Sequence, residues 1–199
     1  MIHLIGVDHF KAQRKKRGLE LTELQRHYQS VVESAITSIH PDLLAEEDHP
    51  SYLSEDDAES ILQPMARSCG IAHLFVEADR ATQKALGYKT VDIIKVLLIA
   101  RGDGSATAAS AHKIAHQFPI RERFWLTEIN RTNANNVLLV CGDLHFTTLT
   151  NLLAAEGVPY SILAERVGVD ATNDPEYQAL QYAQDRNMFG ETSCFCMES

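Results

Sequence analysis

The chain has 199 residues, of which 45% are hydrophobic and 23% charged, as is typical of a soluble globular protein. Its formal net charge of −9 argues against nucleic acid or an anionic membrane as the main partner, because both select basic surfaces. Four cysteines suit a reducing compartment, and a start at a core-like strand rather than a signal peptide favours a cytoplasmic protein with no membrane span.

Strands and helices alternate along the first part of the chain. Strands are predicted at residues 2–7, 42–47 and 71–77. A helix over 21–39 follows from apolar residues at helical spacing, and Thr22 with Gln25 forms a capping box at its start. A second helix over 54–68 opens with acids and should be kinked or split by Pro64.

The alternation continues to about residue 168. Helices are predicted at 91–100, 107–117, 120–132 and 148–156, and strands at 137–141 and 160–163. A flexible loop is expected near 101–106, and residues 169–199 are expected to form a C-terminal helix over 175–185 and a partly loose tail. The pattern predicts a single α/β domain over 1–168, with a mostly parallel central sheet covered by helices on both faces.

Ligands of such sheets bind at the carboxyl ends of the strands, so the residues directly after each strand are candidates for a site. Histidine or acid follows four predicted strands, and the residues at this edge are Asp8, His9, Glu46, Glu47, Glu77, Asp79, Arg80, Asp143 and His145. Imidazole and carboxylate groups together suit a divalent metal such as Zn²⁺, Mn²⁺ or Co²⁺, or general acid–base chemistry. One functional site is therefore expected at this edge.

The pattern Gly-x-x-His occurs three times, at residues 6–9, 70–73 and 142–145. The first and third copies follow strands, where glycine permits a tight turn and the histidine can face the edge. The middle copy precedes its strand, so Gly70 and His73 are interpreted as a helix stop and a strand residue.

Three other features have simpler interpretations. His112 and His116 are four residues apart on a predicted helix, but Lys113 stands where a metal-protease helix has glutamate, so both are interpreted as surface histidines. The basic segment 11–17 is interpreted as a solvated loop, with binding of an acidic substrate or phosphate as the alternative. For the C-x-C of residues 194–196, metal or redox chemistry is the alternative to an inert tail.

Four short motifs, in this order, resemble the TraB/Tiki group, which belongs to a wider superfamily with haem-binding ChaN-like and erythromycin-esterase-like proteins. They are the Gly-x-x-His of residues 6–9, the strand 43–47 that ends in glutamate, the Arg-x-x-x-Trp of residues 121–125, and the Gly-x-x-His of residues 142–145. In the third motif, Glu122 and Trp125 stand where the family has asparagine and methionine. The resemblance covers about residues 1–165 and implies an α/β fold with the motifs converging on one site.

Tiki-like members are metal-dependent peptidases. The resemblance therefore implies that His9, Glu46 or Glu47, and His145 are metal ligands. It also implies that Arg121 contacts the substrate or an oxyanion.

The first hypothesis is therefore a metal-dependent hydrolase of an amide or ester bond in a small-molecule or peptide substrate, using Mn²⁺, Co²⁺ or Zn²⁺. Its general base would be Asp143, Asp8 or a spare glutamate, and Glu77 is a further catalytic candidate. The second hypothesis is a non-enzymatic protein that binds a small molecule or haem at the same edge. Haem is the less favoured cofactor, because no apolar aromatic stripe accompanies the motifs. A scaffold without activity is the third alternative.

Overall fold

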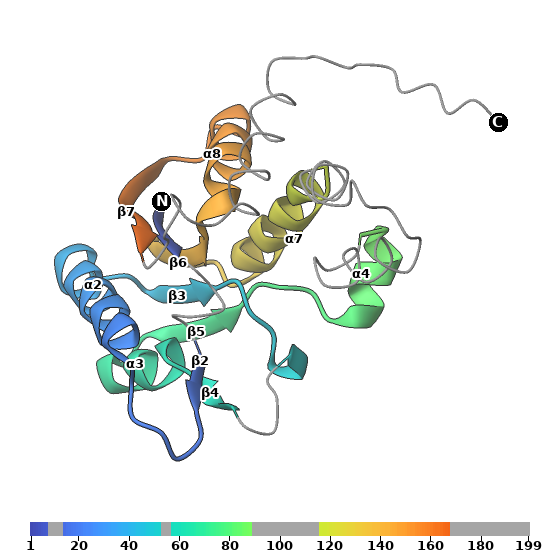
Figure 1. The fold of residues 1–199 in the computed structure, drawn as a ribbon. Coiled ribbons are helices and arrows are strands. Elements are labelled where there is room, and N and C mark those ends of the chain that lie inside the picture. The colour runs from blue at the N-terminus through green and yellow to red at the C-terminus, as the bar shows by residue number, and fades with distance from the viewer. Residues whose placement is uncertain (8–13, 53–56, 89–115, 168–199) are drawn as a thin grey trace. The chain divides into compact units, whose positions relative to one another are not determined.

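The computed structural model describes residues 1–7, 14–52, 57–88 and 116–167 (Figure 1). The chain divides into two units, and nearly all described residues belong to the first, which comprises 1–88 and 118–170. Several predicted features lie outside the described residues: Asp8, His9, His112, the helices over 91–100 and 175–185, most of the helix over 107–117, the loop at 101–106 and the C-x-C of 194–196.

An all-parallel sheet of five strands, in the order β5-β3-β6-β1-β7, forms the centre of the first unit. Its strands are β1 (Ile2–Val7), β3 (Leu43–Glu46), β5 (Ala72–Phe75), β6 (Val137–Gly142) and β7 (Tyr160–Val167). β6 and β1 lie between other strands, and their side chains are buried along their whole length. The predicted parallel α/β fold is confirmed.

Helices pack on both faces of this sheet, as Figure 1 shows. One face carries α2 (Glu23–Ile39) and α3 (Leu62–Cys69), and the other carries α7 (Phe118–Arg131) and α8 (Phe146–Ala155). Successive residues of a strand point to opposite faces, so in β6 Leu138 packs with α2 and α3 whereas Leu139 packs with α7 and α8. The two cores are therefore separated by the sheet.

The start of α2 follows the predicted capping box. The N–H of Gln25 donates to Thr22 Oγ1 over 3.2 Å, and the N–H of Thr22 donates to Gln25 Oε1 over 2.9 Å. His40 ends the helix in the left-handed conformation, with φ of 48°. This helix was therefore predictable at both ends from local signals.

The segment predicted as one helix over 54–68 is different. Residues 57–60 form strand β4 (Asp57–Ser60), which pairs antiparallel with β2 (Arg14–Lys16), inside the segment predicted as a basic loop. Pairing between these distant segments overrides the local helical pattern. Pro64 is the third residue of α3, where its missing N–H has no intrahelical partner, so it neither kinks nor splits the helix.

Two short elements near the carboxyl edge were not predicted. They are the 3-10 helix η1 (Pro50–Tyr52) and the helix α4 (Arg80–Leu86), whose first turn is capped by Asp79 accepting the N–H of Thr82 over 2.7 Å. A further 3-10 turn, η2 (Asp143–His145), joins β6 to α8. Within the part of the chain that the structure describes, no helix is long and apolar enough to cross a membrane.

Candidate active site

Glu46 and Glu47 at the end of β3 point to opposite faces of the sheet. The carboxylate of Glu46 accepts the hydroxyl of Ser60 over 2.7 Å and lies 2.6 Å from His73 Nε2, on the side of α3. The carboxylate of Glu47 faces α7 and contacts Arg121. Of the two acids, Glu47 therefore belongs to the predicted edge site, and Glu46 forms a separate, partly buried pair with His73.

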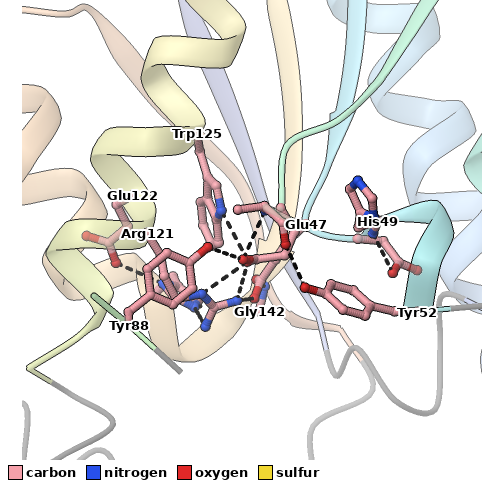
Figure 2. A network of polar contacts seen from close by, with 12 residues as sticks. Glu47, His49, Tyr52, Tyr88, Arg121, Glu122, Trp125 and Gly142 are labelled. Carbon is pink, nitrogen blue, oxygen red and sulfur yellow. Dashed lines mark hydrogen bonds and ion pairs between the residues drawn. The ribbon is translucent and has the colours of Figure 1, made fainter. Parts of the chain in front are cut away.

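Arg121 on α7 is the central cation of the edge cluster, which we define as Glu47, Glu77, Arg121, Glu122 and His145. Figure 2 labels Glu47, Arg121 and Glu122 of this cluster. The Nη2 of Arg121 donates to Glu47 Oε1 and, over 2.6 Å, to Glu77 Oε2. The N–H at Nε also donates to Glu77 Oε2, over 3.1 Å. The other oxygen of Glu47 accepts the backbone N–H of Gly142 over 2.7 Å. The guanidinium thus ties the carboxyl end of β3 to the segment after β5.

Arg121 keeps its charge in this partly buried position. Burial lowers the pKa of Arg121, but the carboxylates of Glu77 and Glu47 outweigh this and raise it above its ordinary value. Its guanidinium carbon also lies 5.3 Å from the centre of the Trp125 ring, a cation–π contact one helical turn away. The Arg-x-x-x-Trp spacing therefore places both side chains on one face of α7.

His145 is the last residue of η2, the turn that follows β6, and is only 3% exposed. Its Nδ1 is 2.8 Å from Glu122 Oε1, and its Nε2 is 3.1 Å from Arg121 Nη1 and 3.4 Å from Glu47 Oε1. Burial lowers the pKa of His145, but the carboxylates of Glu47 and Glu122 raise it, and the net change is upward. The ring can therefore accept a proton within the cluster.

Glu122 was not among the predicted site residues, although its sequence carries a signal for one. Glu122 is fully buried and shares the inner face of α7 with Phe118, Trp125, Leu126 and Ile129. An acid at the buried position of an amphipathic helix needs a partner, and here the partner is His145. Phe118 and Trp125 pack against the imidazole, with ring centres 4.1 and 4.5 Å away.

Glu77 is held by Trp125 of the Arg-x-x-x-Trp motif and by two residues that were not predicted as site residues, Tyr88 and Gln83. Its Oε1 accepts the hydroxyl of Tyr88 over 2.6 Å and an N–H of Gln83 over 3.4 Å, and the indole N–H of Trp125 donates to Oε2 over 3.3 Å. Burial, followed by the charge of Glu77, raises the pKa of Tyr88 above its ordinary value and that of Tyr52 to about 12. Gln83 lies on α4, which was not predicted, so no local pattern pointed to it.

Asp143 lies after β6, as predicted, and its carboxylate contacts the end of β7. Its Oδ1 accepts the N–H of Arg166 over 2.8 Å, and Arg166 has a φ of 58°, a conformation that L-residues rarely adopt. A Cβ added to Gly6 would lie 2.9 Å from the same oxygen, so only glycine allows this approach. Asp143 thus joins the ends of β6, β1 and β7.

The described residues do not fit a divalent metal ion. Within residues 1–7, 14–52, 57–88 and 116–167, no three His, Cys, Asp or Glu side chains are arranged to hold one. The atoms of Glu47, Glu77 and His145 that would have to bind a metal ion instead contact the guanidinium of Arg121. A cation already occupies that position, so no chemical step is assigned to a metal.

These contacts bring Glu47, Glu77, Arg121 and His145 together, leave Glu46 on the opposite face, and add Glu122. Comparison of the chain with protein-family models, curated proteins and solved structures finds no match. The similarity to TraB/Tiki proteins therefore stays a prediction, and the function has to be inferred from the edge cluster itself.

Proposed function

We propose that the chain is a hydrolase of an amide or ester bond, with the edge cluster as its active site. One observation supports this most directly: His145 Nε2 and Glu47 Oε1 are buried 3.4 Å apart at the carboxyl ends of parallel strands, where ligands of such sheets bind. An imidazole and a carboxylate at this separation can share and transfer a proton. A guanidinium beside them supplies a fixed positive charge.

In the proposed reaction, the oxygen of a water molecule attacks the carbonyl carbon while the ring of His145 takes one of the water's protons. The carbonyl oxygen becomes an oxyanion, and Arg121 stabilises it by donating a hydrogen bond. The C–N or C–O bond then breaks, and the protonated ring returns its proton to the leaving nitrogen or oxygen. Glu47 stabilises the imidazolium, and Glu77 keeps Arg121 in place.

The test is a screen of peptides, amides and esters with the full chain, first treated with a chelator and then with Mn²⁺, Co²⁺ or Zn²⁺ added. Glu47→Gln removes one member of the proposed pair, and Glu46→Gln is its matched control, because it changes the neighbouring acid on the opposite face. We expect turnover by the wild type and by Glu46→Gln, and a roughly 100-fold or larger loss of kcat in Glu47→Gln and His145→Ala.

Two results would contradict the proposal. One is the absence of turnover above the His145→Ala background for every substrate class, with or without metal; ligand binding without turnover would then favour the non-enzymatic alternative. The other is an equal loss of kcat in Glu46→Gln and Glu47→Gln, because a general structural effect would explain it. Activity that appears only after metal loading would require ligands beyond the described residues.

A further inference from the structure

The two ring nitrogens of His145 have neighbours of opposite hydrogen-bonding character. A guanidinium can only donate, and Arg121 Nη1 lies 3.1 Å from Nε2. An ionised carboxylate can only accept, and Glu122 Oε1 lies 2.8 Å from Nδ1. In the neutral ring, Nε2 must therefore accept and Nδ1 must carry the hydrogen, so both neighbours select the same tautomer.

The carboxylate of Glu122 is held for this contact. Glu122 is fully buried, and the hydroxyl of Thr148, in the first turn of α8, donates to the same Oε1 atom that accepts His145 Nδ1–H. Its Oε2 atom has no hydrogen-bond partner among the groups that the structure describes. A carboxylate whose role is only structural would be expected to have both buried oxygens satisfied. Here, the hydrogen bonds converge on the oxygen that contacts the imidazole.

We propose that Glu122 is the positioning residue of this site: it holds the hydrogen of His145 on Nδ1 and so leaves Nε2 as the nitrogen that exchanges a proton with the substrate. The assignment of the tautomer depends only on the contacts of His145. The role of Nε2 rests on the hydrolase function proposed above.

This assignment completes the proton path. A proton taken from water at Nε2 gives an imidazolium whose Nδ1–H donates to Glu122 Oε1 at 2.8 Å and whose Nε2–H has Glu47 Oε1 3.4 Å away. In this step the N–H of Arg121 that Nε2 had accepted turns to the oxyanion, because two donors cannot bond to each other. The same proton then leaves Nε2 for the leaving nitrogen or oxygen as the bond to the carbonyl carbon breaks. The hydrogen on Nδ1 stays in place throughout, in the same way as an acid-oriented histidine acts in other hydrolases.

The test is a long-range ¹H–¹⁵N correlation spectrum of the full-length, ¹⁵N-labelled protein at a pH where the ring of His145 is neutral. The two ring nitrogens give well-separated signals, so the spectrum identifies the one that carries hydrogen. We expect hydrogen on Nδ1 in the wild type. We expect a mixture of tautomers in Glu122→Gln, because an amide can donate to Nδ1 as well as accept from it, and Arg121 alone then favours hydrogen on Nδ1.

Two controls separate the carboxylate from general packing. Glu128→Gln changes a partly exposed acid on the same helix and should leave the spectrum of His145 unchanged. His73, which pairs with Glu46 on the other face of the sheet, is an internal reference that Glu122→Gln should not affect. Where turnover is measurable, Glu122→Gln should lower kcat by roughly 10²-fold with KM little changed.

The proposal is overturned if the wild-type ring carries its hydrogen on Nε2, or if folded Glu122→Gln keeps the wild-type tautomer. Should Glu122→Gln not fold, Thr148→Val decides the matter. This variant removes the hydroxyl that donates to Glu122 Oε1, so the tautomer of His145 should persist while the resonance of its Nδ1 proton shifts. A resonance that does not shift overturns the proposal. Because the spectrum needs no substrate, failure of the hydrolase screen is distinguishable from failure of this assignment.

Discussion

Two consecutive residues at the carboxyl end of β3, Glu46 and Glu47, each lie close to a histidine, but the two surroundings differ. On the α3 face, each oxygen of Glu46 has a partner: His73 at 2.6 Å and the hydroxyl of Ser60 at 2.7 Å. On the α7 face, Glu47 lies within a larger group of acids that share Arg121 and His145. Both oxygens of Glu46 are therefore satisfied locally, whereas Glu47 belongs to an extended network of charged groups.

Charge distinguishes the two faces further. The Glu46–His73 contact sets one acid against one histidine. The edge cluster sets three acids, Glu47, Glu77 and Glu122, against one guanidinium and one imidazole, so its acids outnumber its basic groups. A buried surplus of negative charge is unfavourable unless a proton or a ligand offsets it. This surplus makes the α7 face the better candidate for chemistry.

The largest expected effect comes from removing the cation of the edge cluster. Arg121→Met keeps much of the side-chain volume but leaves Glu47 and Glu77 buried without their main counter-charge. We expect the free energy of unfolding to fall by about 3–5 kcal/mol, as for a broken buried ion pair. Urea denaturation at neutral pH measures it, and a loss below about 1 kcal/mol would show that water already screens this cluster.

A smaller effect is expected from the hydrogen bond between Tyr88 and Glu77. Tyr88→Phe deletes only the hydroxyl, which donates to Glu77 Oε1 over 2.6 Å in a buried position. Hydrogen bonds to charged groups contribute about 1.5–3 kcal/mol, so we expect a loss of about 2 kcal/mol in the same denaturation experiment. An unchanged midpoint would mean that Gln83 or solvent replaces the hydroxyl.

The third effect is a change in pH dependence that tells the two faces apart. Burial raises the pKa of Glu46 above 4.5, although the hydrogen bond with His73 opposes it, and the pKa of His145 is raised above 6.5. Both groups bind a proton more tightly in the folded state, so each stabilises the fold below the unfolded pKa and loses that contribution as the pH rises through the folded pKa.

Glu46→Gln should therefore gain stability relative to the wild type as the pH rises above 4.5. His145→Gln should gain it only as the pH rises above 6.5. Denaturation midpoints measured between about pH 4 and pH 9 follow both differences. Identical pH profiles for the two variants would mean that the faces are electrostatically coupled through the sheet.

The smallest effect is expected on the outer side of α7. Glu128 pairs with Arg131, whose side chain is 68% exposed, and Glu128→Gln should change the free energy of unfolding by less than about 0.5 kcal/mol. The same denaturation experiment applies. A larger loss would show that α7 depends on surface charge as well as on its buried face, and this variant would then be a poor control.

Much of the fold was predictable because local signals and tertiary structure agree. Apolar strands 2–7 and 137–141 are buried on both faces, and the capping box at Thr22 starts α2 as expected. The errors are at segments whose structure depends on distant partners. Strand β4 forms against β2, more than 40 residues earlier in the chain, and no periodicity within residues 57–60 indicates that pairing.

The edge site was partly predictable for the same reason. A parallel sheet brings its carboxyl ends together, so Glu47, Glu77 and His145 could be grouped from sequence, and Arg121 was added by the family resemblance. The contact between Glu122 and His145 could not be predicted from sequence, because it depends on how α7 packs against the end of β6.

The sequence predicts a strand that ends at Glu46 and Glu47, and the alternation of side chains along a strand then requires these two to face opposite sides of the sheet. Which of them meets Arg121, a residue 74 positions away from Glu47, is known only from the folded structure. Alternation is a property of the backbone and is local. The choice of face depends on where α7 docks, and that depends on the packing of two separate cores against one sheet.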